Sequence, residues 1–379
     1  MSAMKQFKNA QIYTGFHVIH GGFAVDNGRF CEVGPEAPDA LDLGGALVLP
    51  GLIDIHTHGN SGHDFSDGDY EGLKTMAAFY ARHGITSFAP ASMTLPEDVL
   101  AKAYETAVRL HEEQPEGCAV LRGIQMEGPF FAESKKGAQN GDYLRAPDIQ
   151  MFHRLQETAR GLIRIADVAP EEPGGLDFVK EVSHSCRVSL AHTAADYDTA
   201  KAAFEAGASH VTHLFNAMPP MLHRAPGVIG AACENENVTA ELIGDGLHVH
   251  PSTVRLAYRA FGPQRLCLIS DSLSCCGCEN GVYMLGGQQV FLDGAIARLA
   301  DGTIAGSANH LFGILQSTVA MGIPLADAVR MATYNPARVL GVEHEVGQIA
   351  PGLRADFLIC TPELQLSQVW LGGTLFDLI

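Results

Sequence analysis

The chain has 379 residues, 46% of them apolar, and its 25 basic and 43 acidic side chains give a formal net charge of −18. This apolar content can build a large core, which excludes a disordered chain, and the acidic balance argues against nucleic acid as a partner. No apolar run reaches the roughly 18 residues of a membrane span, and the first residues lack an apolar export segment, so we expect a cytoplasmic protein with no membrane partner.

The two ends of the chain differ from its middle. Residues 1–49 and 346–379 contain short alternating runs broken by glycine turns such as Gly21-Gly22 and Gly44-Gly45. These runs predict one small discontinuous β-sandwich domain. Residues 50–345 alternate short β-branched runs with helical stretches, which predicts βα units around a parallel sheet.

Eight such runs are strand candidates, and eight parallel strands close a (β/α)8 barrel of the TIM type. In chain order they are residues 48–55, 85–90, 120–126, 163–168, 188–191, 210–213, 238–243 and 266–270. The helices expected between them are residues 73–83, 96–114, 146–159, 175–185, 196–206 and 252–260. The Gly-rich segment from Cys275 to Ala305 is too irregular for a barrel helix, and a loop this long is usually functional.

The cysteines do not indicate a disulfide framework. There are nine, an odd number scattered through a large chain, which favours reduced thiols. Cys275, Cys276 and Cys278 are close in sequence, but a tetrahedral zinc site needs a fourth ligand. We therefore do not expect a metal at this cluster.

Histidine and carboxylate side chains follow five of the predicted strands. The active sites of such barrels lie at the C-terminal ends of the strands. Taken singly, each residue also fits a hydrogen-bonded core histidine or a helix-capping acid. Together they would be costly to bury without a cation, so we predict a metal site there. The residues are His56, His58, Glu127, His192, His213 and Asp271.

Several segments resemble the N-acetylglucosamine-6-phosphate deacetylases of the amidohydrolase superfamily. The Glu-Gly-Pro-Phe and His-Leu-Phe-Asn-Ala-Met motifs are specific to this branch, and the match runs in order from about residue 5 to residue 377. The matching segments are residues 50–59, 127–130, 191–193, 212–218, 270–271 and 347–356.

The resemblance implies that Glu127, His192 and His213 hold one divalent ion. His56 and His58 would support a second, with Glu127 and Asp271 shared or adjacent. Some members of the family lack the His-x-His pair and use one metal, so one ion and two ions both stay open. Zinc is the first expectation, with iron, manganese or cobalt as alternatives.

The catalytic role implied for Asp271 is to take a proton from water and deliver it to the leaving amine. The resemblance also implies that Asn216, Ala217 and His248 hold the sugar phosphate. Arg224 would reach it from the neighbouring subunit of a homodimer, because a guanidinium binds phosphate with two parallel hydrogen bonds. The alternative for Arg224 is a solvated surface charge.

Two positions depart from the family pattern. Gln139 replaces a histidine that contacts the substrate carbonyl; it can donate an N–H to that oxygen but carries no charge. Asn309-His310 replaces Leu-Thr, and this pair either reshapes the pocket or caps the next helix.

The predicted function is hydrolysis of the N-acetyl amide of N-acetylglucosamine 6-phosphate to glucosamine 6-phosphate and acetate. N-acetylgalactosamine 6-phosphate or another N-acyl amino compound is the alternative substrate. A non-catalytic metal-binding barrel is a third reading, against which the intact ligand set and Asp271 argue.

Overall fold

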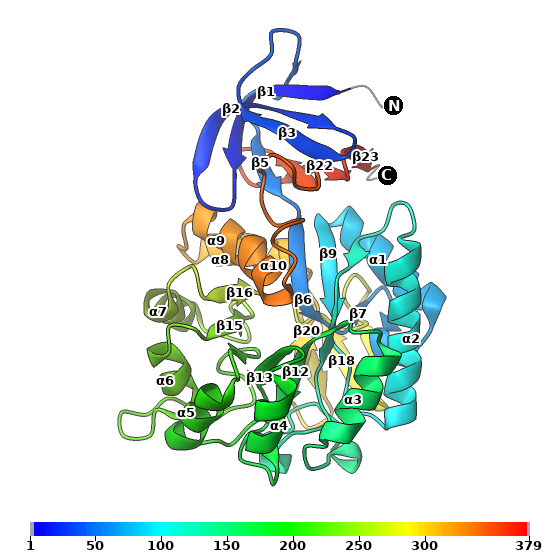
Figure 1. Cartoon of the computed structure of the whole chain (residues 1–379), viewed down its shortest axis with the longest axis vertical. Helices are drawn as coiled ribbons and strands as arrows, with labels where there is room; N and C mark the ends of the chain where they lie inside the picture. The colour runs from blue at the N-terminus through cyan, green and yellow to red at the C-terminus, as the bar shows by residue number, and fades with distance from the viewer. Residues whose placement is uncertain (1–3, 377–379) are drawn as a thin grey trace.

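The computed structural model describes residues 4–376. A barrel of parallel strands wrapped by helices forms the larger part, and a β-sheet containing both chain ends covers one end of it (Figure 1). Within residues 4–376, no helix combines the length and the apolar character needed to cross a bilayer.

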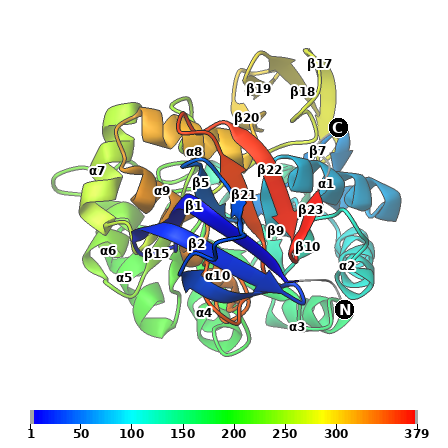
Figure 2. The same ribbon diagram turned by 90° about the horizontal axis from the view of Figure 1, so that it is seen from above.

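Strands from both chain ends form one hydrogen-bonded sheet. Its order is β23-β22-β21-β5-β1-β2-β3, with β4 beside β1, so strands from the first and the last part of the chain share one sheet (Figure 2). The predicted β domain built from both termini is confirmed, while its boundaries at residues 49 and 346 stay a prediction. The strands are β1 (Lys5–Tyr13), β2 (Val18–Asp26), β3 (Arg29–Gly34), β4 (Leu41–Asp42), β5 (Leu47–Pro50), β21 (Phe357–Cys360), β22 (Leu366–Leu371) and β23 (Thr374–Phe376).

An aromatic core holds this sheet together. Phe357 of β21 stacks on Trp370 of β22 with ring centroids 5.2 Å apart, and Phe7 of β1 stacks on Phe23 of β2 at 4.6 Å. The ring centroids of Phe30 in β3 and Phe357 in β21 are 5.8 Å apart, although three strands lie between β3 and β21 along the sheet. The sheet therefore curls over its own core, which buries the large aromatic areas that dominate the stability of small β domains.

The predicted barrel is confirmed. Every strand pairs in parallel with the next, a bridge between Ala91 and Gln125 joins β9 to β11, and Asp271 N donates to His56 O at 2.9 Å where the last strand meets the first. The strands are β6 (Leu52–Thr57), β9 (Ile85–Pro90), β10 (Val120–Leu121) with β11 (Ile124–Met126), β12 (Ile163–Val168), β13 (Arg187–Leu190), β14 (His210–Val211), β15 (Thr239–Leu242) and β16 (Leu266–Leu268).

One predicted strand, residues 48–55, is wrong as a single element. Residues up to Pro50 belong to β5 of the terminal sheet, and the barrel strand β6 begins at Leu52. The chain bends at Gly51, where a Cβ would overlap the side chain of Thr86 and where the backbone N–H donates to Asp356 O at 2.9 Å. Only glycine allows this close approach, so one apolar run serves both domains.

The six predicted helices all form, with ends within a few residues of the expected ones. Asp69, Asp148 and Asp196 cap three of them by accepting hydrogen bonds from backbone N–H groups of the first turn. They are α1 (Tyr70–Arg82), α2 (Glu97–Glu113), α3 (Ile149–Thr158), α4 (Gly175–Val182), α5 (Tyr197–Ala206) and α7 (Pro251–Phe261). The further helices are α6 (Gly227–Glu234), α8 (Leu311–Ala320), α9 (Leu325–Ala332) and α10 (Tyr334–Leu340).

Residues 275–305, expected to be a long Gly-rich loop with short alternating segments and no barrel helix, contain no helix but form a sheet instead of a loop. An antiparallel sheet of four strands, β17 (Gly281–Leu285), β18 (Gln288–Asp293), β19 (Ile296–Leu299) and β20 (Ile304–Ser307), projects to one side of the barrel (Figure 2). Leu285, Val290 and Leu292 pack with Ala138 in a separate apolar cluster. The alternation of buried and exposed residues in β18 has the period of two that a half-buried strand shows.

All nine cysteines are free, as predicted, and the side-chain groups of residues 4–376 that could hold a metal contain no cysteine.

The open question about Asn309 and His310 is settled in favour of capping. His310 is the N-cap of α8, where its Nδ1 accepts from Gly313 N at 3.2 Å, and Asn309 Oδ1 accepts from His310 N at 3.0 Å. Burial, reinforced by the neighbouring His83, lowers the pKa of His310 to about 3. The imidazole is therefore neutral and able to accept.

His310→Ala should lower the free energy of unfolding by about 1 kcal/mol, the usual cost of a lost cap, without changing KM. Because the pKa of His310 is lowered in the folded state, the unfolded chain binds the proton more readily. The wild type should therefore lose stability as pH falls below about 6.5. The variant should lose less. Urea unfolding at about pH 7 and pH 5 measures both effects. His184→Ala, at an exposed histidine, is the control. If His310→Ala lowers the free energy of unfolding no more than His184→Ala does, the capping role is refuted.

Candidate active site

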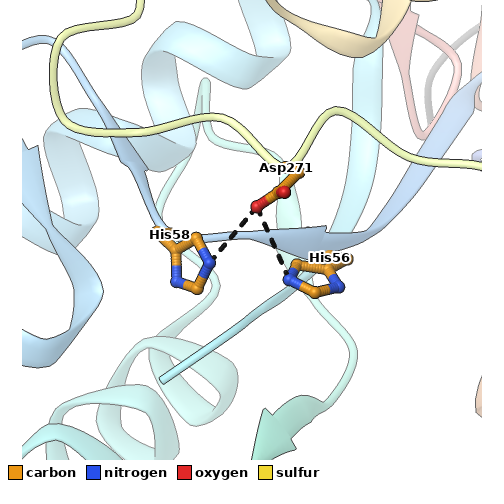
Figure 3. Close-up of side chains that lie close together, drawn as sticks. All are labelled: His56, His58 and Asp271. Atoms are coloured by element: carbon orange, nitrogen blue, oxygen red, sulfur yellow. Dashed lines mark ion pairs between the residues drawn. The ribbon is translucent and has the colours of Figure 1, made fainter. Parts of the chain in front are cut away.

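Two groups of side chains meet at the C-terminal ends of the barrel strands. His56 and His58 at the end of β6 face Asp271, which follows β16 (Figure 3). The ligand atoms of each group lie within 4.8 Å of one another. The second group consists of Glu127 after β11, His192 after β13 and His213 after β14.

The backbone at three of these positions is in the left-handed region. His192, His213 and Asp271 have φ values of 44°, 29° and 48°. Side chains other than glycine rarely adopt this conformation, and it is concentrated at functional sites. Each of these residues comes two or three positions after the last residue of a strand.

Glu127 joins the two groups. Its Oε1 lies 3.2 Å from Nε2 of His192, 3.2 Å from Nε2 of His213 and 3.4 Å from Nε2 of His56. Its Oε2 lies 3.3 Å from Nε2 of His58. One carboxylate therefore contacts all four imidazoles.

The spacing of these atoms fits metal coordination. Asp271 Oδ1 lies 3.3 Å from Nε2 of His58 and 3.6 Å from Nε2 of His56, and Nε2 of His192 and Nε2 of His213 are 3.1 Å apart. Ligands about 2.0–2.1 Å from a tetrahedral ion are separated by about 3.3 Å. The side chains are thus already arranged as they would be around an ion.

Hydrogen bonds determine which nitrogen of His58 and of His192 faces the centre. Nδ1 of His58 lies 3.1 Å from Ala91 O, and Nδ1 of His192 lies 2.8 Å from Lys135 O. A carbonyl oxygen only accepts, so each Nδ1 carries the hydrogen and each Nε2 presents a lone pair. Nε2 of His56 is buried with no hydrogen-bond partner. Lone pairs aimed at carboxylates repel them unless a cation lies between, so the residues fit a divalent metal.

The two carboxylates of the site are ionised. Burial alone would raise the pKa of Glu127, but the imidazoles of His56, His192 and His213 hold it well below its usual value. Burial likewise opposes ionisation of Asp271, but its contact with His58 and the nearby imidazoles of His56 and His213 outweigh burial and lower the pKa. Asp271 can therefore accept a proton at neutral pH.

A cavity of about 170 Å³ opens onto these groups. The end of the four-stranded sheet, residues 303–306, forms part of its wall. Of the residues predicted to bind substrate, four line the cavity and one does not. Arg224 lies exposed in a tight turn bridged by Leu222 and Ala225, outside the lining of this cavity. The four that line it are Gln139, Asn216, Ala217 and His248.

Gln139 is buried, and both ends of its amide are engaged. Its Nε2 donates to Glu127 Oε2 at 2.6 Å, and its Oε1 accepts from Thr94 N at 2.7 Å. It therefore contacts the carboxylate that joins the two groups of ligands.

His248 is held by Asp245, a residue that the sequence analysis missed. Asp245 Oδ2 lies 2.7 Å from His248 Nδ1, and Oδ1 accepts from the backbone N–H groups of Leu247 and His248. Nε2 of His248 is buried without a partner, and the residue lines the cavity, so this nitrogen is available to a ligand. The Asp-Gly-x-His spacing was the available signal for Asp245.

The sequence analysis also missed two more buried polar residues, Glu241 and His210. Glu241 of β15 lies 2.8 Å from His56 Nδ1 and 3.2 Å from His210 Nε2. Burial opposes its ionisation, but these two imidazoles lower the pKa of Glu241 to about 2. An acid within a fully buried parallel strand was the available signal, because such strands are usually apolar throughout.

A (β/α)8 barrel with four histidines, a glutamate and an aspartate at its strand ends defines an amidohydrolase. A model of the amidohydrolase family matches residues 47–375, and the chain belongs to that family, whose members depend on metal ions.

The relatives in this family are amino sugar phosphate deacetylases, which confirms the resemblance drawn from the sequence. N-acetylglucosamine-6-phosphate deacetylase from Bacillus subtilis (strain 168) is 35% identical over 370 residues, covering 95% of this chain and 93% of the relative. N-acetylgalactosamine-6-phosphate deacetylase from Escherichia coli O157:H7 is 32% identical, covering 93% of each chain.

Solved structures of N-acetylglucosamine-6-phosphate deacetylases also match this fold over nearly the whole chain. A mutant N-acetyl-D-glucosamine-6-phosphate deacetylase from Mycobacterium smegmatis, in complex with N-acetyl-D-glucosamine-6-phosphate, matches with a TM-score of 0.94 at 32% identity, covering 99% of this chain and 100% of that one. The enzyme from Pasteurella multocida matches with a TM-score of 0.92 at 30% identity, covering 98% and 99%.

Proposed function

We propose that this protein hydrolyses the N-acetyl amide of N-acetylglucosamine 6-phosphate, with water, to glucosamine 6-phosphate and acetate. The observation that carries the proposal is the meeting of both ligand groups on Glu127, with donor atoms 3.1–3.6 Å apart, at the edge of the cavity. The nine free thiols support a reducing compartment, and we place the reaction in the cytoplasm.

Glu127, His192 and His213 would hold one divalent ion, and His56, His58 and Asp271 a second. Imidazole and carboxylate ligands suit zinc, which we propose ahead of iron, manganese or cobalt. When bound, such an ion polarises a carbonyl and makes a water molecule a stronger acid.

The protein's own residues move the proton and hold the sugar. Asp271, ionised and 3.3 Å from His58 Nε2, takes the proton of the attacking water and returns it to the nitrogen of the leaving amine. His248 offers its free Nε2 to a polar group of the sugar, and Asn216 and Ala217 line the same cavity. Gln139, beside Glu127, is close enough to the reacting centre to donate to the acyl oxygen after a small rearrangement of its side chain.

Arg224 would bind the phosphate of the substrate that lies in the active site of the neighbouring subunit of a homodimer. Its exposed position, outside its own cavity, supports this arrangement. Charge-assisted bonds to phosphate contribute about 1.5–3 kcal/mol, so Arg224→Ala should raise KM for the phosphorylated substrate by about 10- to 100-fold. KM for the unphosphorylated sugar should stay unchanged. Steady-state kinetics measures this effect, with the exposed Arg259→Ala as the control.

Mixing two impaired variants tests the contribution across the interface. A mixed dimer of Arg224→Ala and Asp271→Asn contains one site with an intact Asp271 and an Arg224 from the other subunit. Activity should reappear on mixing. If no activity reappears although mixed dimers form, the arginine does not act across subunits.

The second candidate substrate is N-acetylgalactosamine 6-phosphate, which the Escherichia coli relative is named for. Acetate release by the metal-loaded protein should be measured on both epimers and on unphosphorylated N-acetylglucosamine. Turnover that needs the phosphate and is fastest with the gluco epimer supports the proposal. Faster turnover of the galacto epimer favours the alternative, and no turnover on any of the three refutes both.

A further inference from the structure

Glu241 is a carboxylate inside the barrel that lines no part of the substrate cavity. It lies on β15, and its side chain is fully buried. Oε2 lies 2.8 Å from Nδ1 of His56 and 3.1 Å from the backbone N of His213, while Oε1 lies 3.2 Å from Nε2 of His210. Both oxygens are therefore occupied by donors, as a buried carboxylate requires.

This contact determines the state of His56. A carboxylate only accepts hydrogen bonds, so Nδ1 of His56 carries a hydrogen, and Nε2 is the nitrogen that carries the lone pair in the neutral imidazole that binds a metal. Nε2 points toward Asp271, 3.6 Å from its Oδ1 (Figure 3). The other tautomer would place an N–H in the centre of the site, where it could not bind a metal.

His56 differs in this respect from the other histidines of the site. Nδ1 of His58 and Nδ1 of His192 each face a backbone carbonyl, and within residues 4–376 Nδ1 of His213 has no hydrogen-bond partner. Only His56, among the four described ligand histidines, is oriented by another side chain. A single substitution can therefore release His56 and leave the Nδ1 contacts of His58 and His192 in place.

His210 holds Glu241 in turn. Its Nε2 faces Oε1 of Glu241, and its Nδ1 lies 2.6 Å from Oγ1 of Thr239. The chain Thr239–His210–Glu241–His56 thus runs through the barrel interior to the site.

We propose that Glu241 is a positioning residue that makes His56 a metal ligand, so that binding of the ion at His56, His58 and Asp271 depends on it. The inference rests on the proposed metal-dependent function but concerns the binding of the ion, not turnover. Partners of this kind typically change metal affinity by about 10- to 100-fold.

The test is zinc binding to the full-length protein, by competition with a chromophoric chelator and by metal analysis after dialysis against buffered zinc. Glu241→Met removes the hydrogen-bond acceptor and keeps a similar side-chain volume. It should lower the affinity for one of the two zinc ions by about 10- to 100-fold. His56→Ala is the reference and should affect the same ion. The ion at Glu127, His192 and His213 should remain, which also reports that the variant is folded.

Three further variants keep the test decisive. Glu241→Gln can still accept from His56 through its amide oxygen and should bind both ions nearly as wild type does. Glu241→Asp keeps the charge but is too short to reach His56, and it replaces Glu241→Met if that variant does not fold. Asp167→Asn is the matched control, because Asp167 is equally buried but hydrogen-bonds Gln125 and Thr212 instead of a ligand histidine.

Two results would overturn the inference. One is zinc binding that stays unchanged in Glu241→Met, or in Glu241→Asp if only that variant folds. The other is zinc binding that stays unchanged in His56→Ala, because His56 would then hold no ion for Glu241 to support. Failure of the proposed function is a separate observation: acetate is not released from any of the sugars although zinc binds as described.

Discussion

Asp271→Asn is expected to lower kcat for acetate release by about 100- to 10,000-fold, the range that a positioned general acid or base contributes. Asparagine has the same shape as aspartate and keeps one oxygen near His58, but its amide cannot take a proton from water or return one to the leaving amine. KM should change little, because Asp271 contributes to the chemical step more than to holding the sugar.

Steady-state kinetics and metal analysis of the same preparation check this prediction. Asp271 also faces His56 and His58, so Asp271→Asn should weaken the binding of an ion by that group. The ion at the other group, Glu127, His192 and His213, should remain bound. A variant with that ion in place and kcat within a few-fold of wild type would exclude Asp271 as the group that transfers the proton.

Glu127→Ala should remove both metal ions and reduce turnover to the uncatalysed rate. Its two oxygens contact Nε2 of His56, His58, His192 and His213 at 3.2–3.4 Å, so no other side chain of the site touches as many ligands. Without this carboxylate the group of His192 and His213 has no neutralising charge, and the group of His56 and His58 keeps that of Asp271 alone, so the affinity for divalent cations should fall steeply.

Removal of metal from the wild type by a chelator should likewise abolish turnover. Addition of zinc should restore activity to the wild type but not to Glu127→Ala. Metal analysis and acetate release measure both steps. Glu172→Gln, a change at a half-buried acid that does not line the cavity, is the control. Turnover by a preparation shown to be free of metal would contradict the proposed function.

That these side chains lie together could be predicted from the sequence because the fold brings strand ends together. His56, Glu127, His192, His213 and Asp271 are far apart along the chain, but each follows a predicted strand of a parallel barrel, and such ends share one face. The caps at Asp69, Asp148 and Asp196 are local, which explains why the helices they begin were predicted within a few residues.

Other features depend on contacts between distant segments. The Pro50-Gly51 pair is a local turn signal within the apolar run, but the close approach of Thr86 to Gly51 and the division of the run between two sheets are visible only in the structure. The glycines between the strands of the sheet β17–β20, such as Gly286 and Gly287, lie in its turns, whereas the packing of this sheet against Ala138 joins distant segments.

By itself the sequence determined the barrel, the order of its strands and the residue types that meet at its mouth, because periodicity and motif spacing are local properties. Only the tertiary structure decided which atoms meet. It placed Glu241 2.8 Å from His56, and it turned the Gln139 amide toward Glu127. These contacts join residues 185 and 12 positions apart, and their geometry follows from how neighbouring strands pack, which no single segment of the chain encodes.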